Sequence, residues 1–111
     1  MSMQLLIFIL NKEELLEEVL EAFIELGISG ATIIDSIGMG RILAHDIPIF
    51  AGFRNLMQDS RAGNKTILTV IEENKLERVI KAVEQILGPL DTPGAGILFT
   101  LPVQSMFGMT K

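Results

Sequence analysis

The fold is decided by a stretch that occurs twice, NKEELLEEVLEAFIELG at residues 11–27 and NKLERVIKAVEQILG at residues 74–88. Both copies begin with Asn-Lys, carry a Glu three residues after the Asn and end in Gly. Between these ends, apolar side chains recur every three or four residues, which is the pattern of a helix with one buried face. The Asn and Glu predict a capping box at the start of each helix, and the Gly predicts a left-handed residue at its end.

Each copy lies between two apolar runs that predict β-strands. Residues 3–10 and 31–37 flank the first copy, and residues 65–71 and 96–103 flank the second. The order is strand, helix, strand, a long central segment, strand, helix, strand. It predicts an α+β fold of the ferredoxin-like (split βαβ) type, with a four-stranded antiparallel sheet and both helices on one face. A chain of 111 residues is long enough for one such domain and too short for two.

The predicted strands are apolar on both faces. Residues 5–10 read LLIFIL, so both sides of that strand carry large apolar side chains. Because two helices on one face leave the other face open, we expect another subunit to cover it, in an oligomer packed sheet to sheet. The alternative is that alternate apolar side chains are simply exposed.

The composition excludes several classes of protein. The chain has no Cys, which excludes disulfide frameworks, thiolate metal sites and cysteine nucleophiles and is compatible with a cytoplasmic location. A formal net charge of −5 argues against nucleic-acid binding. The apolar runs are shorter than the ~20 residues that span a bilayer, and no Lys or Arg precedes the first run as it would in a signal peptide.

The central segment, residues 41–64, differs from the rest of the chain in charge and in pattern. Residues 12–25 hold six Glu and one Lys, whereas residues 41–65 hold four basic and two acidic residues. The segment has no clean period and contains Pro48 and Gly52, so it is predicted to be a long loop or a hairpin extension. Its charge suits either a solvated surface or contact with an anion.

The sequence offers no catalytic constellation. The one His, His45, cannot form a typical zinc site without Cys or further ligands, and it is most simply a surface side chain. Ser36 and Ser60 have no credible base partner that would make them nucleophiles. We therefore expect a protein that is not an enzyme and that holds no metal.

Two glycine clusters mark the ends of predicted strands. Gly-Met-Gly-Arg at residues 38–41 follows the second strand, and Asp-Thr-Pro-Gly-Ala-Gly at residues 91–96 precedes the last one. Glycines let backbone N–H groups approach an anion, and an Arg adds a forked contact to phosphate. Each cluster alone is also typical of an ordinary turn. Together they predict an anion site, which we expect where two subunits meet.

These stretches resemble the PII signal-transduction proteins, a family of trimeric nitrogen regulators. Residues 30–45 (GATIIDSIGMGRILAH) are similar to the family's second strand and the start of its T-loop, and residues 94–103 (GAGILFTLPV) to its B-loop and the strand behind it. The T-loop would then span residues 41–64, followed at the chain end by a tail over residues 103–111. The resemblance implies a ferredoxin-like trimer with nucleotide sites in the clefts between subunits. The matching site positions are Thr32, Gly38, Gly40, Arg41, Gly94 and Gly96.

The sequence departs from the family pattern where phosphates would bind. Ile42 stands where the family has Gln, and Ala95 and Ile97 stand where it has the B-loop Asp and Lys. Gly108 and Thr110 take the positions of a C-terminal Arg pair. Each lost charge-assisted contact is worth about 1.5–3 kcal/mol, so the usual ATP affinity should be abolished. The chain also has no Tyr, so uridylylation of the T-loop is excluded.

The resemblance implies a non-catalytic regulator. A small ligand in the subunit cleft, with an adenine nucleotide among the candidates, would order or release residues 41–64 for contact with a membrane transporter or an enzyme. Two alternatives share the architecture, a trimeric metal-binding protein resembling the CutA copper-tolerance proteins and an ACT-like sensor of small molecules. The expected partner contacts are His45, Phe50, Phe53, Arg54 and Arg61.

Overall fold

A computed structural model describes residues 2–46 and 63–108, with residues 44–46 described by their backbone alone. Two strand-helix-strand units follow each other along the chain, and a 3₁₀ turn precedes the main helix of each unit. The elements are β1 (Met3–Leu10), η1 (Glu13–Leu15), α1 (Leu16–Glu25), β2 (Thr32–Ser36), α2 (Met39–Asp46), β3 (Asn64–Glu72), η3 (Glu73–Lys75), α4 (Leu76–Leu87) and β4 (Gly96–Val103).

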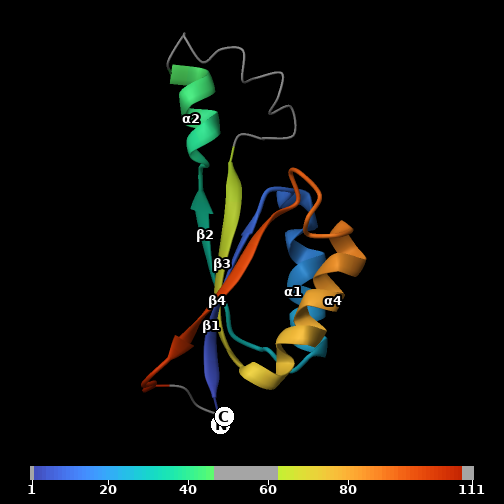
Figure 1. Ribbon diagram of the computed structural model, residues 1–111, viewed down its shortest axis with the longest axis vertical. Coiled ribbons are helices and arrows are strands. Elements are labelled where there is room, and N and C mark those ends of the chain that lie inside the picture. The colour runs from blue at the N-terminus through green and yellow to red at the C-terminus, as the bar shows by residue number, and fades with distance from the viewer. Residues whose placement is uncertain (1, 47–62, 109–111) are drawn as a thin grey trace.

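The four strands form one antiparallel sheet in the order β2-β3-β1-β4. β1 lies inside this sheet and pairs along its whole length with both β3 and β4. Figure 1 shows α1 and α4 side by side on one face of the sheet, and the two helices contact each other. The ferredoxin-like α+β fold predicted from the sequence is confirmed.

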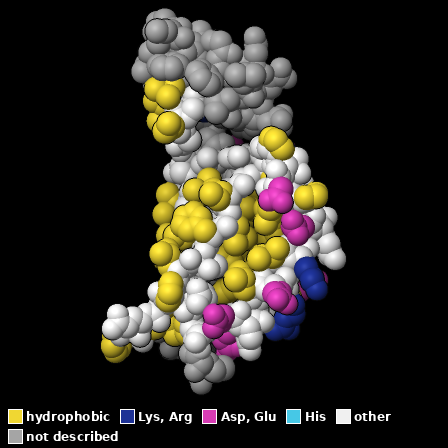
Figure 2. Space-filling view, in the orientation of Figure 1, with side chains coloured by type: hydrophobic (Ala, Val, Ile, Leu, Met, Phe, Trp, Pro, Cys, Tyr) yellow, Lys and Arg dark blue, Asp and Glu magenta, His cyan; other side chains and the backbone are white. Residues whose placement is uncertain are grey.

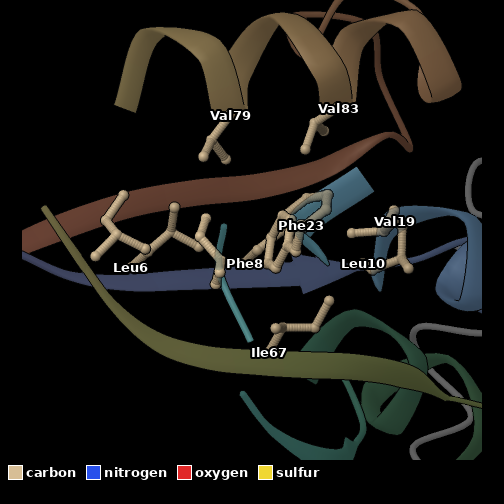
Figure 3. Packing of buried hydrophobic residues seen from close by; sticks show 10 residues of the cluster. Leu6, Phe8, Leu10, Val19, Phe23, Ile67, Val79 and Val83 are labelled. Atoms are coloured by element: carbon tan, nitrogen blue, oxygen red, sulfur yellow. The ribbon is translucent and has the colours of Figure 1, made fainter. Parts of the chain in front are cut away.

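The face of the sheet that carries the helices holds the hydrophobic core. Leu6, Phe8 and Leu10 of β1 are completely buried there, because alternate side chains of a strand share one face. The helical spacing of three to four residues brings the apolar side chains of each helix to the same layer. Figure 3 shows the β1 side chains packed with the buried residues of the helices and of β3, namely Val19, Phe23, Val79, Val83 and Ile67.

The opposite face of the sheet is also apolar, but it lies open in a single chain. Ile97, Phe99 and Leu101 of β4 are 56%, 40% and 46% exposed. Their register partners on β1 are Ile9, Ile7 and Leu5, which share this face. Figure 2 shows hydrophobic side chains gathered over the sheet and charged ones over the helices. Within residues 2–46 and 63–108 no element covers this open face.

The helix starts differ from the prediction, whereas the helix ends agree with it. The N-cap residues make no side-chain capping hydrogen bond, so the capping boxes predicted at Asn11 and Asn74 are wrong. Asn11 is engaged elsewhere, since its Nδ2 donates to the carbonyl oxygen of Gly94 at 3.4 Å. Gly27 and Gly88 have positive φ values of 83° and 87°, which favour glycine as expected at the helix ends. The ψ of −177° at Gly88 makes that residue extended rather than left-handed helical.

The start of the central segment is helical, where the sequence predicted a loop or hairpin extension from residue 41 onward. Glycines normally indicate a break, but α2 begins directly after Gly38, whose carbonyl oxygen accepts the N–H of Ile42 at 3.3 Å. The helix is described from Met39 to Asp46. Of the expected partner contacts, His45 lies on α2, whereas the others lie outside the described residues, namely Phe50, Phe53, Arg54 and Arg61.

Candidate functional site

Both glycine segments lie at the same end of the sheet. β2 ends at Ser36, just before residues 38–41, and β4 begins at Gly96, the last glycine of the second segment. The register links these strand ends, because Ser36 pairs with Asn64 and Leu10 pairs with Gly96. β2 and β4 are the two edge strands, so three strand spacings, about 14 Å, separate the segments. One chain therefore places them at the same end but on opposite edges.

The first segment forms the start of α2 rather than an open loop. Gly38 precedes the helix, and Arg41 is half-buried in its first turn. Among residues 2–46 and 63–108, the atom nearest to a Cβ added at Gly38 is Asn64 Nδ2 at 3.8 Å, an ordinary contact distance. The described part of the fold therefore does not require a glycine at this position.

The second segment needs a glycine for reasons internal to the fold. Gly96 has a φ of 131°, and a Cβ added there would lie 2.3 Å from the carbonyl oxygen of Ile9. The loop in front of it is held by its own turns, since the N–H of Ala95 donates to the carbonyl oxygen of Thr92 at 3.2 Å. The N–H of Leu90 donates to a carboxylate oxygen of Glu84. Gly96 is thus explained by packing, whatever else the loop binds.

Thr32 does not join the other expected site residues within one chain. It begins β2 and pairs with Leu68, on the open face of the sheet. Six residues of extended chain, about 20 Å, separate it from Gly38. Thr32 can meet a glycine segment only if that segment belongs to another copy.

The structure adds a row of polar residues that the sequence reasoning did not connect. Ser36, Asn64 and Thr66 lie on the open face beside the first glycine segment, and Asn11 joins this row to Gly94 of the second. Ser36 Oγ donates to Asn64 Oδ1 at 2.5 Å and lies 2.7 Å from Thr66 Oγ1, and Asn64 Nδ2 donates to Asn11 Oδ1 at 3.3 Å. In the sequence, the feature that could have indicated this row is a polar residue at or just beyond the end of an otherwise apolar strand.

Lys65, the neighbour of Asn64 in β3, is already paired. Lys65 Nζ donates to the carboxylate of Asp35 and lies 3.8 Å from Glu13 Oε1. The hydrogen bond to Asp35 is the largest cause that raises the pKa of Lys65 above its ordinary value, and the charges of both carboxylates add to it against a smaller opposing effect of burial. Lys65 is therefore a poor candidate for holding an anionic ligand.

A shallow apolar groove of about 200 Å³ lies at the other end of β2, away from the glycine segments. It runs between α1 and the start of β2. The groove is lined by Leu20, Phe23, Ile24, Ile28, Ser29, Gly30, Ala31 and Ile33.

No group of three His, Cys, Asp or Glu side chains in the described part of the chain is arranged to hold a metal ion.

The sequence matches the family model of nitrogen regulatory protein P-II over residues 3–110. The chain belongs to the P-II family. The resemblance drawn from the two glycine segments is thereby confirmed, and with it membership of a family of regulatory proteins. A comparison with curated proteins finds no match.

No helix among residues 2–46 and 63–108 is long and apolar enough to cross a membrane.

Solved structures share the P-II fold with this chain. The crystal structure of Arabidopsis thaliana PII bound to citrate is 20% identical in sequence and superimposes with a TM-score of 0.63, over 92% of this chain and 78% of that one. A functionally unknown protein from Pediococcus pentosaceus is 19% identical, with a TM-score of 0.65 over 98% of this chain and 99% of that one. At these identities the likeness supports the fold alone.

Proposed function

We propose that this P-II family member is a non-catalytic, trimeric regulator that binds a small ligand between subunits and a protein partner through residues 41–64. The observation that carries the proposal is the position of the glycine segments, at one end of the sheet but on its opposite edges. A site that uses both needs a second copy of the chain. Family membership and the expected cytoplasmic location are consistent with this role.

The open face of the sheet supports the assembly. Large apolar side chains at 40% to 56% exposure, adjacent on β4, are a surface that a soluble protein normally covers. A closed ring of copies covers the same face in every subunit, which an open chain of copies does not. The trimer is the ring that the family resemblance implies.

The few basic residues near the proposed ligand site favour a ligand with little negative charge. Residues 88–97 carry no Lys or Arg and one acidic residue, Asp91. Lys65 is occupied by Asp35 and Glu13, which leaves Arg41 as the cation of the first segment. One guanidinium matches a single phosphate or carboxylate better than a triphosphate. We therefore expect AMP to bind more tightly than ADP, and ADP more tightly than ATP.

The partner site rests on the composition of residues 41–64. This segment places apolar residues such as Phe50 and Phe53 beside Arg54 and Arg61, a mixture typical of protein-protein contacts. His45 precedes them at the end of α2. A membrane transporter or an enzyme with an acidic, partly apolar surface is the partner that this composition fits.

Isothermal titration calorimetry with AMP, ADP and ATP, each alone and with bicarbonate or 2-oxoglutarate, tests the ligand site. We expect the Arg41→Ala variant to bind at least tenfold more weakly, because it loses a charge-assisted contact. Arg78→Ala, which removes an exposed Arg from α4, is the matched control and should bind as the wild type does. Failure of every nucleotide to bind the wild type would overturn the adenine-nucleotide proposal.

A further inference from the structure

A polar row crosses the end of the sheet where its apolar open face stops. Ser36 of β2 pairs with Asn64 of β3. Asn11 follows the last residue of β1, Leu10, whose partner on β4 is Gly96. The row therefore reaches from the edge strand that leads into the first glycine segment to the loop that contains the second.

The hydrogen bonds of this row all run in one direction. The carbonyl oxygen of Gly94 can only accept, so Asn11 must turn its Nδ2 toward it. Asn11 then presents Oδ1 to Asn64, which must donate through its own Nδ2. Asn64 consequently presents Oδ1 to Ser36, whose single hydroxyl proton is used there, so the hydroxyl of Thr66 donates to Ser36 Oγ. One carbonyl thus fixes the orientation of four side chains.

Because part of the row is buried, reversing the direction of its hydrogen bonds would cost free energy. Asn64 is only 8% exposed, and a buried amide that faces the wrong partner loses its hydrogen bonds and is not compensated by water. Aligned donors also strengthen one another along a chain. The bonds differ in length, since those through Asn11 measure 3.3 and 3.4 Å, whereas those at Ser36 measure 2.5 and 2.7 Å. Asn11 therefore makes the two longest hydrogen bonds of the row.

We propose that Asn11 and Asn64 are positioning residues that couple the loop of the second glycine segment to the open face of the sheet, through the chain Gly94-Asn11-Asn64-Ser36-Thr66. The proposal rests on the proposed function, because that function places a ligand at this loop and another subunit on the open face. A ligand that moves the Gly94 carbonyl takes away the acceptor of the Asn11 Nδ2 and, through Asn11, changes the orientation of the Thr66 hydroxyl. Occupancy of the site is thereby conveyed to the surface on which subunits meet.

The Asn11→Asp variant removes the longest hydrogen bond of the row, from Asn11 to Gly94, and keeps the others. An Asp side chain keeps the oxygen that accepts from Asn64 and loses the N–H₂ that donates to Gly94. The matched control is Thr69→Val, which also removes a buried hydrogen bond from this sheet. Thr69 is 4% exposed, and its hydroxyl donates to the carbonyl oxygen of Gly30, outside the row.

The test is amide hydrogen exchange and NMR on the full chain without ligand. The N–H groups of Thr92 and Ala95 donate within the loop turns, so they report loop opening. We expect Asn11→Asp to speed their exchange about fivefold, the effect of one ordinary hydrogen bond, and to shift the methyl resonance of Thr66. Thr69→Val should change neither. Asn11→Ala replaces Asn11→Asp if the new carboxylate prevents folding.

The outcomes separate this proposal from the proposed function. If exchange at Thr92 and Ala95 rises no more in the Asn11 variant than in Thr69→Val, or if the Thr66 methyl does not move, the coupling is overturned. A purely structural loss at Asn11 speeds local exchange without changing Thr66, so the methyl shift distinguishes positioning from packing. If the wild type binds no nucleotide, the proposed function fails, while the exchange data still decide whether the chain of hydrogen bonds couples the two places.

Discussion

The two faces of the sheet carry similar apolar side chains but differ in how far a single chain buries them. On the helix face, Leu6 and Phe8 of β1 are completely buried within one chain. On the open face, Phe99 and Leu101 of the adjacent β4 remain 40% and 46% exposed. Both sets follow from strict alternation along strands that are apolar at nearly every position. The difference shows that one apolar face of the sheet serves the fold of a single chain, and under the proposed assembly the other face serves contact between chains.

The boundary of the open face lies next to the proposed site. The apolar open face ends at Ser36 and Asn64, and the glycine segments lie just beyond that boundary. A second copy that covers the open face would bring one of its edges close to this end of the sheet. A ligand site between copies then lies beside the subunit contact, which is where coupling between ligand and assembly is easiest to achieve.

The largest expected effect comes from breaking the helix face. Phe8→Ala should lower the free energy of unfolding by about 3–5 kcal/mol, because it removes a fully buried aromatic ring and leaves a cavity in the core cluster that includes Val19, Phe23 and Val83. Urea unfolding followed by circular dichroism measures this loss. Phe99→Ala is the comparison on the open face, measured at a concentration where the chain is monomeric, and should cost much less. Equal losses would show that the two faces do not differ in the way described.

A smaller effect, on assembly rather than on folding, is expected from the open face. Phe99→Glu should weaken self-association at least a hundredfold, because it places a carboxylate in an apolar contact. Its circular dichroism spectrum should stay that of the wild type. Phe107→Glu is the matched control, since Phe107 is 92% exposed and lies beyond the end of β4. Sedimentation velocity decides, and an unchanged sedimentation coefficient for Phe99→Glu would contradict the proposed contact.

Most of the fold could be predicted from the sequence because it depends on local periodicity. The apolar stripes, the alternation and the helix-ending glycines Gly27 and Gly88 are all readable within a few residues of each element. The start of the first helix could not be predicted in this way. Asn11 forms a good capping signal with its neighbours, yet its side chain is taken by Gly94 and Asn64, which lie 83 and 53 residues away. At Asn11, hydrogen bonds to residues distant in the sequence replace the local capping bond that the sequence favours.

The candidate site was only partly predictable for the same reason. The two glycine segments were visible as motifs, and the topology places both at one end of the sheet. Their separation across the sheet follows from the strand order, which a sequence pattern does not specify. The polar row combines Asn11, Ser36 and Asn64 from three separate stretches, so it becomes visible only when the register is known. The fold also explains Gly96 by close backbone contact, which composition alone cannot distinguish from a binding role.

The smallest change in stability is expected from the ion pair between Lys65 and Asp35 on the helix side of the sheet. Lys65 pairs with Asp35 across β2 and β3, and this pairing raises the pKa of Lys65. A raised pKa in the folded state means that folding favours the charged form, so this stabilisation is fully present below the ordinary pKa of about 10.5. It is lost as the pH rises from there through the raised value. The wild type should therefore lose stability with pH in that range, and Lys65→Gln, which cannot titrate, should lose less.

Urea midpoints measured between pH 9 and pH 11.5 test this sign. Asp35→Asn is the matched variant, since it keeps Lys65 but removes the carboxylate that raises its pKa, and it should flatten the pH dependence as Lys65→Gln does. Because this pair lies on the helix face of the sheet, its loss should change the midpoint for unfolding and leave self-association unaltered. If the wild type and Lys65→Gln lose stability in parallel across the whole range, the ion pair contributes nothing to folding that depends on the charge of Lys65.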